Sequence, residues 1–277
     1  MTTQANSAAI ESSQINGSGI LQPAGGGTGL TSPGTAGNLL TSDGTVWTSQ
    51  AAPATGRLLN IQYFYSTLSG VPTPYTYTPT TGTNYIIVTL QGGGGGGGPS
   101  DNFNQGSSGG ISYLVNTATS TVLVQAFGGF GGSGGSGTYL ASAGLGQGGT
   151  NGDLIISGGD GQAPITPYLY SGMIVGGGNG GTSFFGGAGK SSSTSLAGGP
   201  AAATSGSGGG GGTYFDGSNH YCGGGGGAGG YVVKKITSGF SPVTLYVGEG
   251  GAGGVTLSPE TNGGAGGTGI VIIEEYS

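Results

Sequence analysis

Short apolar segments alternate with glycine runs from about Leu58 to the end of the chain. Each segment is rich in Val, Ile, Leu or Tyr and is bounded by Gly, Ser, Asn or Pro, which is typical of β-strands. No segment has apolar residues at helical spacing. The pattern predicts an all-β fold with little or no α-helix. The predicted strands are Leu58–Tyr65, Tyr85–Leu90, Ser120–Phe127, Leu154–Ser157, Met173–Val175, Tyr231–Ile236, Val243–Val247 and Ile270–Tyr276.

A β-hairpin is predicted upstream of these strands. Leu39–Ser42 and Thr45–Thr48 flank the dipeptide Asp43-Gly44, and Asp-Gly favours a type I′ hairpin turn. An isolated hairpin is only marginally stable in water. Leu39 and Trp47 therefore need neighbours from other chains or from the next domain, which favours an oligomer.

Residues 1–21 are polar and small, without a hydrophobic period, and are expected to be an arm that orders on a partner. Met1–Ile10 lacks the basic start and hydrophobic middle of a secretory signal, so a secretory route is not indicated. The chain thus divides into an attachment arm at 1–21, a hairpin module at 22–57 and a glycine-rich domain at 58–277.

Glycine dominates the composition, with 73 Gly and 12 Pro among 277 residues. Runs such as Gly92–Gly98 break the three-residue register of collagen and exclude it. Disorder is disfavoured because only 5% of residues are charged while 14 are Tyr and 8 are Phe. Ordered glycine needs dense main-chain hydrogen bonding. Packed polyglycine II helices, with three residues per turn and no internal hydrogen bonds, would supply it and would hold the loops that join them on a rigid support.

The charge pattern excludes several partners. The formal net charge is −6 with only four basic residues, which provides no surface for nucleic acid. No segment approaches the roughly 18 consecutive apolar residues of a membrane span, so membrane insertion is not expected. Cys222 is the single cysteine and has no partner for an intramolecular disulfide. Stability would then come from backbone packing or from association of copies.

Aromatic side chains concentrate in islands between the glycine runs. These islands are candidate contact loops, at Pro99–Gln105, Thr138–Leu145, Ala163–Tyr170, Thr182–Phe185, Thr213–Tyr221 and Leu257–Asn262. Their rings offer flat, amphipathic contact area with few rotatable bonds. The candidate binding residues are Phe103, Tyr139, Tyr168, Tyr170, Phe184, Phe185, Tyr214, Phe215, His220 and Tyr221. The alternative interpretation is that several of these rings close the glycine bundle.

Chemistry-bearing residues form no catalytic or metal-binding motif. His220 lies near Asp216 and Cys222, but one His and one Cys do not complete a zinc site, so His220 is expected to be a polar contact in a binding loop. The G-x-G-x-x-G match at Gly129–Gly134 is not followed by a helix, and Gly189-Lys190-Ser191 lacks the first glycine of a P-loop. No cofactor, metal or catalytic residue is expected.

Two parts of the chain resemble bacteriophage tail-fibre proteins. Residues 25–49 are similar to a short module that recurs in tail fibres, here GGGTGLTSPGTAGNLLTSDGTVWTS. Residues 58–277 resemble the glycine-rich tip domain of tail fibres and of the distal adhesins of T-even-like phages. The motifs that carry the second resemblance are YIIVTLQGGGGGGG at 85–98, CGGGGGAGGYVVKK at 222–235, LYVGEGGAG at 245–253 and GGAGGTGIVIIEEY at 263–276.

The resemblance implies a homotrimeric fibre whose arm attaches to other virion tail proteins and whose polyglycine II tip carries receptor-binding loops. The implied receptor is a bacterial outer-membrane protein or a surface glycan, and the implied location is the tail fibre or tail tip of a virion assembled in the host cytoplasm. The expected function is adhesion without enzymatic activity.

Two other functions remain open from the sequence. One alternative is a structural baseplate, spike or decoration protein whose glycine bundle is a brace. The chain would otherwise be a polysaccharide-degrading tail enzyme if two of its scattered carboxylates met in space. The carboxylates considered are Asp101, Asp153, Asp160, Asp216, Glu249 and Glu260.

Overall fold

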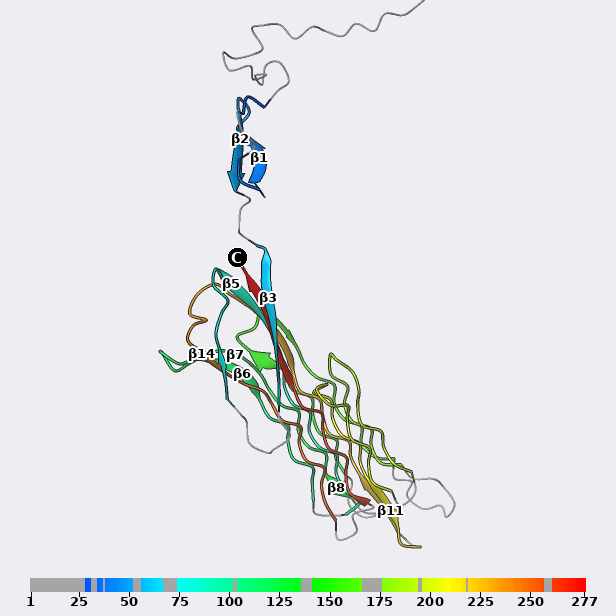
Figure 1. Ribbon diagram of the computed structural model, residues 1–277. Helices are drawn as coiled ribbons and strands as arrows, with labels where there is room; N and C mark the ends of the chain where they lie inside the picture. Colours follow the sequence, from blue (N-terminus) through cyan, green and yellow to red (C-terminus); the bar gives the residue numbers. More distant parts are fainter. Residues whose placement is uncertain are drawn as a thin grey trace, which may run out of the picture. The chain divides into compact units, whose positions relative to one another are not determined.

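A computed structural model describes residues 28–30, 34–36, 38–51, 56–66, 74–101, 104–135, 141–165, 176–193, 196–217, 219–256 and 261–277. The backbone divides into two compact units, Met1–Arg57 and Leu58–Ser277. The described residues form strands β1 to β15 without an α-helix (Figure 1), which confirms the predicted all-β class. The predicted arm at 1–21 and the predicted strand Met173–Val175 lie outside the described residues.

The first unit contains the predicted hairpin, with β1 (Asn38–Ser42) antiparallel to β2 (Trp47–Ala51). The predicted type I′ Asp-Gly turn is wrong, because that turn requires positive φ at both central residues and only Gly44 has it, at +95°. Four residues join the strands instead. The Asp43 carboxylate accepts the N–H groups of Val46 and Thr45, each at 2.8 Å, and these bonds lower the pKa of Asp43 to about 2.

Two five-stranded antiparallel sheets form one part of the second unit. The first sheet has the order β10–β13–β5–β15–β3, and its strands are β3 (Leu58–Tyr65), β5 (Tyr85–Gln91), β10 (Leu154–Ile156), β13 (Tyr231–Ile236) and β15 (Ile270–Tyr276). The second sheet has the order β4–β14–β6–β7–β9, and its strands are β4 (Tyr75–Tyr77), β6 (Ser112–Asn116), β7 (Thr121–Ala126), β9 (Gly149–Thr150) and β14 (Val243–Tyr246).

The two sheets pack face to face as a β-sandwich around an apolar core. Alternate residues of each strand point inward, for example Ile86, Val88 and Leu90 on β5, which meet Leu114 and Leu245 of the other sheet. The glycine runs double back and bring strands that are distant in sequence into one sandwich.

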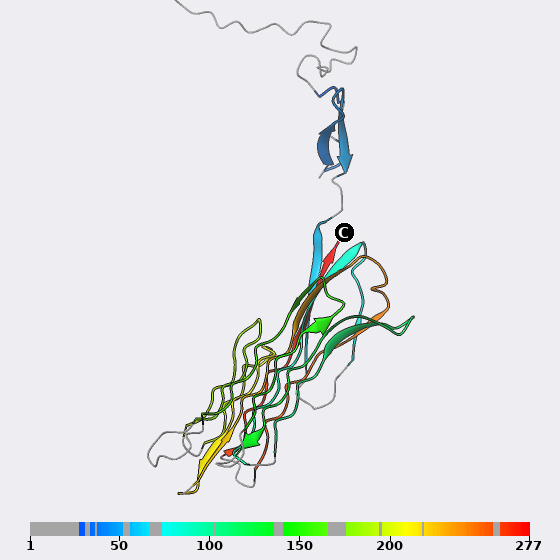
Figure 2. The ribbon, with the colours of Figure 1, turned by 180° about the vertical axis from the view of Figure 1, so that it is seen from behind.

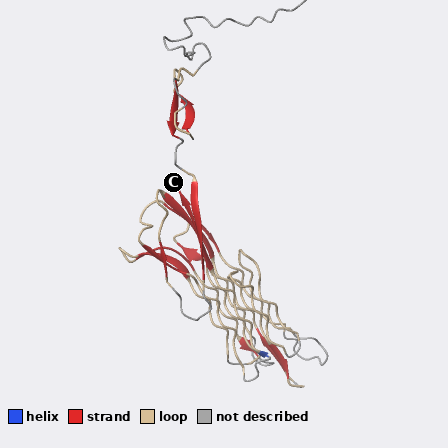
Figure 3. Cartoon of the chain, in the orientation of Figure 1, coloured by secondary structure: helices blue, strands red, loops and turns tan. Residues whose placement is uncertain are grey.

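Strands of the sandwich continue directly into glycine runs. Gly92–Gly98 follows β5 and 223–230 precedes β13, and the Gly92 N–H donates to the Gly230 carbonyl at 2.9 Å, next to the Gln91–Tyr231 strand pair. The sandwich lies at one end of this unit and β8 (Gly134–Gly135) and β11 (Thr213–Phe215) lie at the other, with the glycine runs between them (Figure 2). Figure 3 shows this middle part as loops side by side, here called the glycine bundle.

Gly92–Gly98 shows how the glycine bundle is held together. Each N–H of this run donates to another segment, and the receiving segment repeats every third residue. The acceptors are Gly230, Gly227 and Gly224 for Gly92, Gly95 and Gly98, then Gly110 and Ser107 for Gly93 and Gly96, then Gly267 and Gly264 for Gly94 and Gly97. Its carbonyls accept N–H groups from three further segments, at 129–132, 209–212 and 251–254. The run therefore has six hydrogen-bonded neighbours.

Close approach of backbones explains why these positions are glycine. A Cβ atom on any residue of Gly92–Gly98 would lie between 1.9 and 2.2 Å from a backbone oxygen of a neighbouring segment. None of these seven glycines has a positive φ, so a turn conformation is not the reason for glycine here. The bundle is thus packed through main-chain atoms where the sandwich is packed through side chains.

Glu275 is a buried carboxylate on β15. Its Oε1 accepts a hydrogen bond from Gln62 Nε2 at 2.7 Å, and its Oε2 accepts one from the Thr80 N–H at 3.0 Å. Burial alone would raise the pKa of Glu275, but polar groups of Thr80, Tyr77 and Gln62 together outweigh burial and lower it. Burial, together with the neighbouring Glu275 carboxylate, raises the pKa of Tyr77.

Glu275 is expected to make the second unit sensitive to acid. Because its folded-state pKa lies below the ordinary value of 4.5, its contribution to stability is present above pH 4.5 and is lost as the pH falls through the folded-state pKa. Glu275→Gln is expected to lower the free energy of unfolding by about 1–3 kcal/mol at pH 7, because the Thr80 N–H loses its charged acceptor. Denaturant titrations at pH 7 and pH 3 measure the free energy of unfolding of both proteins. The difference between Glu275→Gln and wild type is expected to be smaller at pH 3 than at pH 7. A difference in free energy of unfolding that is the same at both pH values would contradict stabilisation by the Glu275 charge.

Candidate functional site

A short aromatic hairpin lies at the end of the glycine bundle remote from the sandwich. β11 pairs with β12 (His220–Gly223), with Tyr214 opposite Tyr221 and Phe215 opposite His220, and β12 also pairs with β8. The sequence interpretation treated Thr213–Tyr221 as a loop. That assignment is corrected, because β-prone Tyr and Phe residues flank a four-residue turn and pair across it.

The turn of this hairpin is fixed by Asp216. Its Oδ1 accepts the Asn219 N–H at 2.6 Å and its Oδ2 accepts the Tyr221 hydroxyl at 3.3 Å, while the Asp216 N–H donates to the Asn219 carbonyl at 3.2 Å. Gly217 has φ of +92°, a conformation that other residues rarely adopt. Burial and the Asp216 carboxylate raise the pKa of Tyr221. Asp216 therefore ties the end of β11 to Asn219 and to Tyr221 of β12.

Aromatic rings cover both faces of the hairpin. Residues directly opposite each other share a face and successive residues alternate, so Tyr214 and Tyr221 lie on one face and Phe215 and His220 on the other. The Phe215 and His220 rings stack with centroids 4.4 Å apart, and those of Tyr214 and Tyr221 are 5.9 Å apart. Tyr214 is 40% exposed and Phe215 is 44% exposed. Such rings, beside a carboxylate and an amide, suit contact with another molecule.

Exposed aliphatic residues lie near the hairpin. Leu196 accepts the Thr213 N–H through its carbonyl at 3.0 Å, and Val255 accepts the Asn104 side-chain amide at 3.0 Å close to β8. The side chains of Leu196 and Val255 are both exposed. The end of the bundle thus presents apolar side chains around the aromatic hairpin.

Phe184 and Phe185 are not part of this hairpin surface. They pack on Tyr231 at the start of β13, where the Phe184 and Tyr231 ring centroids are 4.0 Å apart. Tyr231 follows Gly223, the last residue of β12, by eight residues of extended chain, which corresponds to roughly 25 Å at about 3.1 Å per residue. The predicted binding residues therefore fall into two groups at different levels of the bundle.

Four other predicted binding residues, Phe103, Tyr139, Tyr168 and Tyr170, lie outside the described residues. Described residues that flank the first two positions lie beside β8. Gly134 donates its N–H to the Asn104 carbonyl at 2.8 Å, and Ser133 donates to the Ser142 carbonyl at 2.9 Å. Among the described residues, the predicted binding residues at this end of the bundle are Tyr214, Phe215, His220 and Tyr221.

Cys222 follows the aromatic residues of β12 and is buried. Burial raises the pKa of its thiol to about 12, so the thiol is protonated at neutral pH. The described part of the chain contains no group of three or more His, Cys, Asp or Glu residues placed to hold a metal ion.

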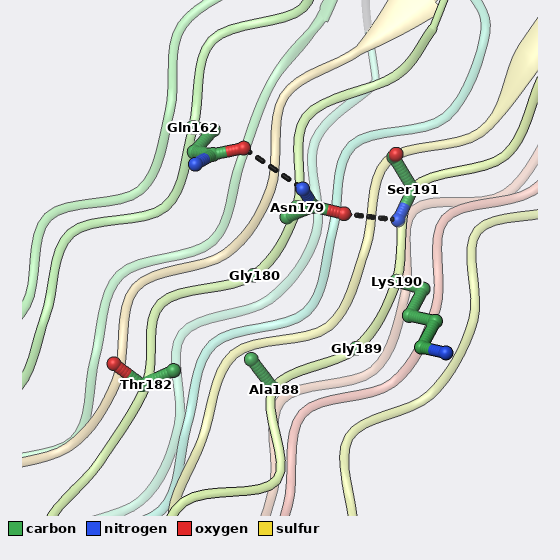
Figure 4. A pocket seen from close by; sticks show the side chains of 8 residues that line it. All are labelled: Gln162, Asn179, Gly180, Thr182, Ala188, Gly189, Lys190 and Ser191. Atoms are coloured by element: carbon green, nitrogen blue, oxygen red, sulfur yellow. Dashed lines mark hydrogen bonds between the residues drawn. The ribbon is translucent and has the colours of Figure 1, made fainter.

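An open groove of about 540 Å³ lies on the flank of the bundle (Figure 4). Asn179 bridges it, donating through Nδ2 to Gln162 Oε1 at 2.9 Å and accepting the Ser191 N–H through Oδ1 at 2.8 Å. The described lining contains Lys190 but no carboxylate or imidazole. A groove with this lining lacks the pair of acid and base groups that hydrolysis of a glycan requires.

Comparison of the chain with protein-family models, curated proteins and solved structures found no match. Within the described ranges, no helix has the length and apolar character needed to cross a membrane.

Proposed function

We propose that this chain is a bacteriophage tail-fibre adhesin that binds a bacterial surface receptor through side chains carried at the end of a rigid glycine scaffold. The observation that carries the proposal is the β11–β12 hairpin, with aromatic rings on both faces, at the far end of the bundle. The tail-fibre motif at 25–49 and the strand-plus-glycine motifs of 58–277 support the same class of protein.

Within this proposal, the glycine runs are polyglycine II helices. Three features of Gly92–Gly98 support the assignment: the partner segment repeats every third residue, no φ is positive, and hydrogen bonds go to six neighbouring segments. A helix with three residues per turn and no internal hydrogen bonds has this pattern. Such a bundle needs no apolar core of its own.

The scaffold would act by limiting the entropy lost on binding. Side chains held on a rigid support lose less conformational freedom when they meet a receptor. Tyr214, Phe215, His220 and Tyr221 would make the contacts, and Asp216 would hold the hairpin tip in place. Several copies on one particle would add avidity to individually weak contacts. The receptor would be an outer-membrane protein or a surface glycan.

Alanine substitution in the hairpin tests the proposal. Fluorescently labelled protein carrying Tyr214→Ala and Phe215→Ala is expected to bind a panel of bacterial strains roughly 10-fold or more weakly than wild type, because exposed rings at the centre of an interface carry much of its binding energy. Flow cytometry of labelled cells measures the binding. Phe130→Ala is a matched control, since Phe130 is also exposed but lies within the glycine bundle, where its carbonyl accepts the Gly227 N–H, and is not part of the hairpin.

Two results would contradict receptor binding by this hairpin. If no strain in the panel binds the wild-type protein, or if the hairpin variant binds as well as wild type, the hairpin is not a receptor contact. Incubating the protein with surface polysaccharide from a bound strain and measuring new reducing ends tests the enzymatic alternative. Release of reducing ends would assign the chain to a polysaccharide-degrading enzyme.

A further inference from the structure

The outer face of the first sheet, the face turned away from the core, carries mostly apolar side chains around Thr89, with Lys235 and Glu274 on either side of Ile87. Its residues alternate with the core residues of the same strands, as Ile87 does with Ile86 and Val88. The strand register places outer residues of all five strands side by side. The outer face is defined here by Leu154, Ile156, Val233, Ile87, Ile272 and Tyr63.

Outward positions of the second sheet are of mixed character. Thr76, Thr244 and Gln125 are polar, whereas Tyr113 and Tyr246 stack their rings with centroids 4.5 Å apart. Strands of the first sheet are apolar on both sides, as in IVII at the start of β15. That pattern is typical of a sheet with both faces covered.

The outer face is large enough to matter energetically. Tyr63 is 54% exposed, Leu154 is 49% exposed and Ile156 is 37% exposed. Phe184 and Phe185 extend the surface by packing on Tyr231. Together these residues leave on the order of 400 Å² of apolar surface, close to the apolar share of the about 800 Å² that each partner contributes to a standard interface.

Charges on this face are self-complementary. Lys235 and Glu274 both lie opposite Ile87 of β5, Lys235 on β13 and Glu274 on β15. Each is one strand spacing, about 4.8 Å, from the central strand. A two-fold axis parallel to the strands would place Lys235 of one copy against Glu274 of the other, twice.

The geometry points to a second copy of this chain as the occupant of the outer face, in a two-fold pair with parallel strands. In this pair the apolar rows of the two sheets cover each other and the Lys235–Glu274 contacts fix the orientation. Parallel strands also place both β11–β12 hairpins at the same end of the pair. The three-fold assembly implied by the tail-fibre resemblance has a different mass and no such two-fold contact.

Native mass spectrometry and sedimentation of the full-length protein test this inference. Wild type is expected at twice the chain mass of 26.2 kDa. Lys235→Glu and Glu274→Lys are each expected to weaken the pair at least ~10-fold, because like charges then face each other at two places. The double variant K235E/E274K is expected to restore the affinity to within about 3-fold of wild type.

Ile272→Lys is expected to give a monomer, and Thr244→Lys, at an outward position of the second sheet, is the matched control that keeps the pair. If Ile272→Lys fails to fold, the charge-reversal variants at Lys235 and Glu274 still test whether the two-fold pair forms. A wild-type monomer, a mass of three chains, or a double variant no tighter than the single variants would each overturn the two-fold pair. These readouts do not depend on receptor binding.

Discussion

Replacing Gly95 by alanine is expected to destabilise the second unit by about 3 kcal/mol or more, the upper part of the range for overpacked interiors. The added Cβ would lie 2.1 Å from the Phe130 carbonyl oxygen and 2.4 Å from its carbonyl carbon. These are main-chain atoms, and Phe130 itself accepts the Gly227 N–H, so neither neighbour can move without breaking hydrogen bonds. The melting temperature is expected to fall by roughly 6–12 °C, measured by calorimetry or circular dichroism.

Gly176→Ala is the matched control for this substitution. Among the described residues, a Cβ at Gly176 would meet only the Ser192 carbonyl oxygen, at 3.8 Å, which is an ordinary contact. Both substitutions restrict the unfolded chain equally, so the difference between them reports packing alone. Gly176→Ala is expected to stay within about 0.5 kcal/mol of wild type. If Gly95→Ala had the same melting temperature as wild type, the glycine backbones would not be in contact at this position.

Side-chain pattern was sufficient to predict most strands of the sandwich, but not β4, β6 or β9. Leu58–Tyr65, Tyr231–Ile236 and Ile270–Tyr276 were predicted with the bounds that the structure has, because each is a β-prone segment that ends at glycine or a polar residue. Strands such as β6 (Ser112–Asn116) were missed, since polar Ser112 and Asn116 occupy two of its buried positions.

The neighbours of each glycine run were beyond prediction from sequence. A glycine carries no side chain that identifies its partner, and the six neighbours of Gly92–Gly98 come from segments up to about 170 residues away in the chain. For the same reason the sequence did not separate Phe184 and Phe185, which pack near the sandwich, from Tyr214 and Phe215 at the far end.

One usable signal was missed. The segment at 177–182 shows this signal. One neighbouring segment accepts the N–H groups of Gly177 and Gly180, and a second accepts those of Gly178 and Gly181. The non-glycine residues Asn179 and Thr182 stand at the third position of the repeat, and their N–H groups have no acceptor in the described chain. A side chain every third residue within a glycine run therefore marks the direction that faces solvent.

Hydrogen exchange is expected to separate these two kinds of position sharply. The N–H groups of Gly92–Gly98 are all bonded to neighbouring segments and buried, so their exchange requires opening of the bundle. Those of Asn179 and Thr182 exchange without opening it. We expect the central run to exchange at least roughly a thousandfold more slowly than these two, a difference of about 4 kcal/mol in opening free energy. Amide-resolved NMR at constant pH measures it. If Gly92–Gly98 exchanged as fast as Asn179, main-chain pairing would not hold the bundle together, and the hairpin at its end would have no rigid support.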